Sequence, residues 1–250
     1  QNMLHQFHER KTLQYDNIAT GMRLLLWGMI KKVVIADRLA IYVNEVFDNH
    51  QNYEGIPVIL ACIFFSLQIY FDFSGYSDMA IGLALVMGFR FPENFDNPYI
   101  SQSITEFWRR WHMSLSRWMR DYLYIPLGGN KVSPARMYIN LWVVFIISGF
   151  WHGAQWTFVI WGILHALGVM ITRELERSMF YRERVPKLTK QLAVFTFVCF
   201  TWIFFRAATL SDAFLICGRI FHAAWTNPWV PAMGLALVLV ASIYQFMLES

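Results

Sequence analysis

A histidine between two long apolar stretches is the side chain in this sequence best placed to transfer a proton. His152 belongs to the run Phe150-Trp151-His152-Gly153, with residues 138–149 before it and residues 156–171 after it. An ionisable side chain at membrane depth is energetically costly and usually faces a protein interior or a water-filled cavity. Because imidazole titrates near neutral pH, we expect His152 to act as a general base, although a packed, hydrogen-bonded histidine would give the same pattern.

A second histidine, His112, lies in a segment whose periodicity predicts an amphipathic helix over residues 107–122. Apolar side chains would share one face of this helix, namely Trp108, Trp111, Leu115, Trp118, Met119 and Tyr122. Arginines would share the other: Arg109, Arg110, Arg117 and Arg120. Ser103 and Glu106 form a capping pattern before it. Such a helix lies in the membrane plane, and His112 would sit at the edge of its aromatic face, either functional or merely interfacial.

Two carboxylates, Asp72 and Asp78, lie inside an apolar region and form the third candidate site. Intramembrane acids usually pair with cations, cap a helix or line a polar path. We expect these two to hold helices together, with Asp72 or Ser74 capping a helix that begins near Gly75. The other histidines give no clear signal. We expect His165 to be structural, and no partners can be named for His5, His8, His50 and His222.

Composition indicates a membrane protein. The 250 residues are 56% hydrophobic and only 15% charged, whereas soluble domains carry about 25% charged residues. The apolar segments are 22–35, 56–71, 75–89, 138–150, 156–171, 188–205 and 232–248. Several are shorter than the roughly 20 residues of a simple transmembrane helix. We therefore expect an all-α, polytopic membrane protein with short, re-entrant and interfacial helices, in which residues 1–250 form one membrane-embedded region of a longer chain.

Basic residues predict the orientation of these segments. One cluster falls within residues 109–136, a second within 173–190, and a smaller one within 31–38. Positively charged loops face the cytoplasm. The intervening residues 138–171 should therefore enter the membrane and return, with the turn at Trp151-His152-Gly153. The net charge of +4 comes from residues beside apolar segments, so it gives no indication of nucleic-acid binding.

Several familiar reaction types find no motif here. The sequence has no zinc-protease, phosphate-loop or serine-nucleophile signature, and we expect no metal site. Cys62, Cys199 and Cys217 lack metal or redox spacing, which predicts buried thiols. The remaining chemistry is a histidine acting on a substrate that arrives already activated.

Five sequence blocks resemble those of the membrane-bound O-acyltransferase family, in its bacterial alginate O-acetyltransferase-like branch, and are also similar to the teichoic acid D-alanyl transfer protein. They are residues 72–82 (DFSGYSDMAIG), 91–95 (FPENF), 107–116 (FWRRWHMSLS), 124–129 (YIPLGG) and 150–153 (FWHG). The resemblance implies a many-helix funnel, a catalytic histidine at His152 and a second site histidine at His112.

The leading hypothesis is therefore transfer of an acyl group, expected to be acetyl, from a cytoplasmic thioester. The donor would be acetyl-coenzyme A or an acyl-phosphopantetheinyl carrier, used as a substrate with no bound cofactor. Arg109, Arg110 and Arg117, with Trp108 and Trp111, would bind it. The acceptor would be an exported polysaccharide such as alginate, or an exported partner acetyltransferase, at the bacterial inner membrane. D-alanyl transfer to a teichoic acid-type polymer, an ion or solute transporter, and a scaffold for a glycan-synthesis complex remain alternatives.

Overall fold

The computed structural model describes residues 4–221, 234 and 236, and every regular element among these residues is helical. They fall into two compact units, residues 4–93 with 234 and 236, and residues 94–221. The expected all-α class is confirmed for this part of the chain, whereas His222 and all of the apolar segment 232–248 except residues 234 and 236 lie outside the described residues.

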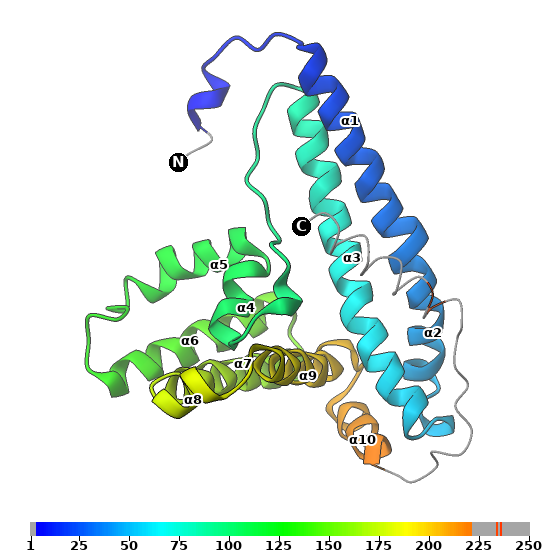
Figure 1. The fold of residues 1–250 in the computed structure, drawn as a ribbon, viewed down its shortest axis with the longest axis vertical. Helices are drawn as coiled ribbons and strands as arrows, with labels where there is room; N and C mark the ends of the chain where they lie inside the picture. The colour runs from blue at the N-terminus through cyan, green and yellow to red at the C-terminus, as the bar shows by residue number, and fades with distance from the viewer. Residues whose placement is uncertain (1–3, 222–233, 235, 237–250) are drawn as a thin grey trace. The chain divides into compact units, whose positions relative to one another are not determined.

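In the first unit two helices that follow one another end to end, α1 (Tyr15–Met29) and α2 (Asp37–Asp48), both pack along a third, α3 (Ile56–Val86), as Figure 1 shows. A π-helical stretch, Ile30–Ala36, joins α1 to α2, and short 3-10 turns occur at Leu4–Phe7 and His50–Asn52. The core between these helices is made of fully buried apolar side chains, among them Leu39, Val43 and Phe64.

The two apolar segments 56–71 and 75–89 were expected to be separate, and this prediction is wrong, because α3 runs through both without a break. Pro57 occupies its first turn, where the missing N–H costs nothing. Ser74 is buried inside the helix, so neither it nor Asp72 caps a helix start. Gly75 serves close packing instead: a Cβ built there would lie 2.7 Å from the carbonyl oxygen of Gly28 on α1.

Both acids of α3 are paired with lysines of the π-helical stretch. Lys31 Nζ lies 2.8 Å from Asp78 Oδ2, and the two side chains are only 14% and 20% exposed. Lys32 Nζ lies 2.6 Å from Asp72 Oδ1 and 2.8 Å from Asp37 Oδ1. Removing one member of a buried pair leaves an uncompensated charge, which is strongly destabilising. The geometry therefore ties the start of α2 to the middle of α3.

Over its described residues, 94–221, the second unit contains seven α-helices, which are labelled in Figure 1. They are α4 (Ile104–Arg110), α5 (Met113–Met119), α6 (Pro134–His152), α7 (Trp156–Leu175), α8 (Met179–Arg184), α9 (Lys187–Arg206) and α10 (Leu210–Phe221). A 3-10 turn at Pro98–Ile100 precedes α4, and a π-helical stretch, Arg120–Tyr124, follows α5. Helix α6 begins with Pro134 in its first turn, and the Ser133 hydroxyl accepts a hydrogen bond from the backbone N–H of Arg136 at 3.4 Å.

Helices α6 and α7 form a tight hairpin, which confirms the predicted return of the chain at residues 151–153. Two glycines make the contact close. A Cβ on Gly149 would collide with the carbonyl oxygen of Phe158, and one on Gly162 would collide with that of Phe145. Helix α9 packs on the other side of α7.

Three helices among the described residues, α3, α7 and α9, are long and apolar enough to cross a membrane. Helix α6 has 19 residues and does not reach the same criterion, which fits the expected mixture of long and short apolar helices. Cys62 and Cys199 are buried as predicted. Cys217 is only partly buried because it lies on α10, whose Phe214 and Leu215 are exposed, so the prediction for this third thiol is wrong.

Substituting Gly162 tests the hairpin contact. Gly162→Ala places a methyl group against the backbone of α6, and overpacking of this kind costs about 1–3 kcal/mol. We expect the thermal unfolding midpoint of the full-length protein in detergent to fall. Gly218→Ala is the matched control, because a Cβ there meets no atom within 4 Å and alanine favours a helix over glycine. Equal midpoints for the two variants would contradict the close packing of α6 on α7.

Candidate active site

His152 lies in the last turn of α6, and its ring is surrounded by aromatic side chains from three helices. The ring centroid is 5.0 Å from that of Trp151, 5.1 Å from that of Trp161 on α7 and 5.0 Å from that of Phe205 on α9. The side chain is half-buried. Within the described residues no hydrogen bond involves the ring nitrogens of His152. An imidazole held in this way is fixed by packing and keeps its nitrogens available for a substrate.

The helix expected over residues 107–122 is wrong as a continuous element. It is divided into α4 and α5 at Trp111 and His112, and His112 has a left-handed backbone with φ 43° and ψ 56°. Non-glycine residues adopt this conformation uncommonly, and tertiary contacts must hold them there. The predicted cap of α4 is confirmed: Ser103 Oγ accepts from the Glu106 backbone N–H at 3.2 Å.

The segment before α4 supplies the contacts that hold this break. The backbone N–H of Met113 donates to the Asn94 carbonyl at 2.9 Å, and the Asn94 side-chain oxygen accepts from both the N–H and the hydroxyl of Ser114, at 3.0 and 2.9 Å. The backbone N–H of Asp96 donates to the Arg110 carbonyl at 2.9 Å. These contacts satisfy the groups that a continuous helix would have paired internally, which is why the break replaces the predicted helix.

The break brings His112 toward His152. The His112 ring centroid is 6.4 Å from that of Trp151, the same indole that packs against His152. Burial, and to a smaller extent the neighbouring His152, lower the pKa of His112 to about 4. His112 is therefore neutral at physiological pH, with one ring nitrogen able to donate and the other able to accept.

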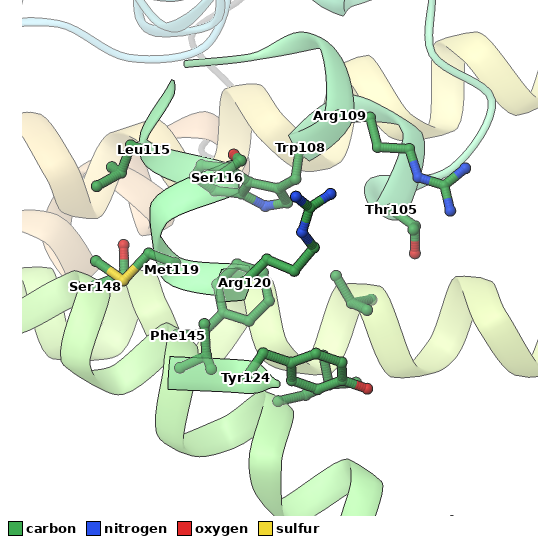
Figure 2. A pocket seen from close by; sticks show the side chains of 13 residues that line it. Thr105, Trp108, Arg109, Leu115, Ser116, Met119, Arg120, Tyr124, Phe145 and Ser148 are labelled. Atoms are coloured by element: carbon green, nitrogen blue, oxygen red, sulfur yellow. The ribbon is translucent and has the colours of Figure 1, made fainter. Parts of the chain in front are cut away.

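A largely apolar cavity of about 220 Å³ lies between α4, α5, α6 and α7 (Figure 2). Its lining consists of Thr105, Trp108, Arg109, Leu115, Ser116, Met119, Arg120, Tyr124, Leu141, Val144, Phe145, Ser148 and Val169. Neither His112 nor His152 lines it. Ser148 does, and it lies one helical turn before His152 on the same face of α6.

Only two of the five predicted donor-binding residues line the cavity. Trp108 and Arg109 line it, with Arg120, whose Nε donates to Asp121 at 2.7 Å (Figure 2). The others do not line it: Arg110 pairs with Glu106 and Asp96, Arg117 Nε donates to the carbonyl of Met113, and Trp111 is buried against Phe95 and Trp202. The break rotates α5 relative to α4, so a single helical wheel could not have separated these side chains.

Sequence reasoning missed Ser148, Phe145 and Tyr124 as cavity-lining residues. The spacing of four residues between Ser148 and His152 was a usable signal for the first. Nothing local indicated the others. Two buried polar atoms on α7, Thr157 Oγ1 and Trp161 Nε1, also have no hydrogen-bond partner in the described part of the chain. Such orphaned atoms are uncommon in folded proteins, and these two belong to the helix that faces His152.

The sequence of this chain matches a known protein family. Residues 3–211 match the model of the membrane-bound O-acyltransferase family. The chain belongs to this family. The resemblance to this family noted in the five sequence blocks is thereby confirmed.

Three relatives illustrate the range of family members to which the chain is similar. It is 44% identical to the peptidoglycan O-acetyltransferase of Helicobacter pylori over 214 residues, which cover 84% of this chain and 41% of that protein. It is 46% identical to the probable alginate O-acetylase AlgI of Pseudomonas aeruginosa over 220 residues, or 88% and 42%. It is 32% identical to the teichoic acid D-alanyltransferase of Bacillus subtilis over 204 residues, or 76% and 51%. The chain thus spans about half or less of the length of these relatives.

Asn94 provides a test of how the break at His112 is held. Asn94→Ala removes both hydrogen bonds to Ser114, and loss of a comparable helix cap costs about 1 kcal/mol. We expect a lower free energy of unfolding for the purified full-length protein in a denaturant titration. Asn52→Ala, at an exposed position after α2, is the control. If both variants unfold alike, Asn94 does not hold the break.

Proposed function

We propose that this chain forms the histidine-bearing part of a membrane O-acyltransferase that transfers an acyl group, acetyl in the first instance, from a thioester to a hydroxyl. The observation that carries this proposal is that the rings of His112 and His152 both lie near Trp151, and that His152 is one helical turn from Ser148, which lines a cavity also lined by Arg109 and Arg120. Family membership supports the reaction class.

The chemistry required of the protein is modest, because a thioester is already reactive toward alcohols. His152 accepts the proton of the acceptor hydroxyl as its oxygen attacks the thioester carbonyl carbon. When the carbon–sulfur bond breaks, the same proton passes to the leaving thiolate. A positioned general base contributes about 10²–10⁴-fold to such a step. Neutral His112 orients the thioester or donates a hydrogen bond to its carbonyl oxygen, where negative charge develops.

The cavity supports a donor with a narrow, mostly apolar arm and a phosphate-bearing end. Its walls are apolar, and Arg109 and Arg120 lie at its edge (Figure 2). Arginine pairs well with phosphate through its planar set of donors. Acetyl-coenzyme A and an acyl-phosphopantetheinyl carrier both have this character, and each enters as a substrate rather than as a bound cofactor.

Acetyl is favoured over D-alanyl by the comparisons. The relatives at 44% and 46% identity are named as O-acetylating proteins, whereas the D-alanyltransferase is at 32%. By analogy, the acceptor is an exported polysaccharide or an exported partner acetyltransferase, within a polysaccharide-synthesis complex. The protein would be a multi-pass protein of the bacterial inner membrane. D-alanyl transfer to a teichoic acid-type polymer is the second candidate.

The transporter alternative is less well supported. An ion relay needs carboxylates that can exchange protons or cations, but Asp72 and Asp78 are each paired with a lysine of the same unit. The pairing favours a structural role for both acids. A pure scaffold would not require His152 to keep its ring nitrogens unoccupied.

Replacing His152 tests the role of the base directly. His152→Gln keeps a hydrogen-bonding side chain of similar size but cannot accept the hydroxyl proton. We expect acetylation of the cell-surface polymer by cells carrying the full-length variant to fall by about 10²-fold or more. His8→Ala, at an exposed histidine in the first unit, is the matched control. Unchanged acetylation at normal protein levels would falsify the assignment of His152.

Arg109 tests the proposed donor site separately from the base. Arg109→Ala should raise KM for acetyl-coenzyme A several-fold and leave kcat nearly unchanged, because it removes binding that is equal in the ground and transition states. Initial rates of the purified full-length protein give both constants. Arg184→Ala, on the exposed face of α8, is the charge-matched control. The donor assignment is wrong if the two substitutions change KM equally.

A further inference from the structure

A buried histidine that the proposed reaction does not use lies at the centre of the second unit. His165, on α7, is fully buried and hydrogen-bonded through both ring nitrogens. The indole N–H of Trp108, on α4, donates to Nδ1 at 3.2 Å. Nε2 lies 3.0 Å from the hydroxyl oxygen of Thr201, on α9. One imidazole thus links three helices that are far apart in the sequence.

The partners determine which nitrogen carries the proton. The Thr201 hydroxyl donates its own hydrogen to the carbonyl of Val198 at 2.9 Å, so it accepts from His165 Nε2–H. Nδ1 is then the unprotonated acceptor for Trp108. The side chain is therefore the neutral Nε2–H tautomer, with all of its hydrogen-bonding capacity used. A histidine with both ring nitrogens hydrogen-bonded stabilises the packing of α4, α7 and α9. Because one of its partners, Trp108, also lines the cavity, the hydrogen bond affects that site as well.

That partner is a wall of the cavity. Trp108 lines the cavity (Figure 2), and its indole N–H, the only polar atom of the side chain, is held by His165. The ring also packs against Phe145, a second lining residue, and against Trp161, which contacts His152. The orientation of the Trp108 indole therefore helps to set the shape of the cavity, and Trp161 connects this wall to His152.

We propose that His165 is a positioning residue, which fixes the Trp108 indole as a wall of the donor cavity through the hydrogen bond to Nδ1. This inference rests on the proposed function, in which that cavity takes the arm of the thioester donor. His165 touches neither donor nor acceptor. Its effect on binding passes through Trp108, and an indole free to rotate would narrow or open the cavity.

Two amide substitutions at His165 test the hydrogen bonds of Nδ1 and Nε2 separately. In His165→Asn the side-chain oxygen lies near the former Nδ1 and can still accept from Trp108. In His165→Gln the amide reaches toward Thr201 and leaves the Trp108 N–H without its acceptor. Trp108→Phe removes the same hydrogen bond from the other partner, and Thr201→Val removes only the bond on the Nε2 side.

The measurement is the dissociation constant of coenzyme A for the purified full-length protein, by calorimetry, which needs no turnover. We expect His165→Gln and Trp108→Phe each to weaken binding by about tenfold, the effect of losing one buried hydrogen bond, and the double variant to weaken it no further. His165→Asn and Thr201→Val should bind nearly as the unaltered protein does. The ¹⁵N–¹H indole resonance of Trp108, identified by its absence from Trp108→Phe, should shift in His165→Gln and stay in place in His165→Asn.

Each outcome separates this inference from the proposed function. If the indole resonance shifts in His165→Gln and coenzyme A binds unchanged, His165 is structural only, and the inference is overturned while the role of His152 stands. If His165→Gln fails to fold, the inference is overturned either by unchanged coenzyme A binding in Trp108→Phe or by a tenfold loss of binding in His165→Asn. An unaltered protein that binds no coenzyme A would overturn the donor assignment and this inference together. Loss of acetylation in His152→Gln, with normal coenzyme A binding, bears only on the catalytic base.

Discussion

The close contact between α6 and α7 determines the geometry of the second unit. Gly149 and Gly162 let the two backbones approach until no side chain fits between them at these points. This contact places the end of α6 directly beside the first turns of α7, and with it the ring of His152 beside Trp161. Phe205 of α9 completes the surroundings, with its ring centroid 5.0 Å from that of His152. The position of the imidazole is thus a consequence of backbone packing rather than of hydrogen bonds to its own ring.

The second histidine is positioned by the opposite device, an interruption of a helix. His112 has a left-handed backbone conformation that costs free energy for any residue with a Cβ. The hydrogen bonds from residues 94–96 offset this cost by satisfying the polar groups that the interruption exposes. Strained residues of this kind are concentrated at functional sites, where the surrounding structure fixes an otherwise unfavourable geometry. The two histidines therefore reach Trp151 from independent elements, one through tight packing and one through a turn.

Sequence patterns predicted the elements whose structure depends on residues close to one another in the sequence. The apolar stretches on either side of His152, the turn between them and the cap at Ser103 could all be recognised from the sequence. Contacts between distant residues decided the rest. The periodicity of residues 107–122 is truly helical, but Asn94 and Asp96 stabilise a break that no helical wheel contains. Asp72 and Asp78 suggested a helix boundary because their lysine partners, 40 and 47 residues earlier, could not be assigned from spacing. The partners of His165 lie 57 and 36 residues away, so nothing local distinguished its two hydrogen bonds.

The π-helical stretch Ile30–Ala36 has a bearing on how this region tolerates changes of length. Its wider turns present the adjacent residues Lys31 and Lys32 to Asp78 and Asp72 on α3. Deleting one residue there would turn every upstream position by about 100° around the helix axis. Gly28 of α1, which packs closely against Gly75, would then face away from α3. Either Lys31 or Lys32 would also lose its carboxylate partner on α3. An insertion or deletion in this stretch changes the rotation of the whole of α1 about its axis. A point substitution leaves that rotation unchanged and is therefore less disruptive here.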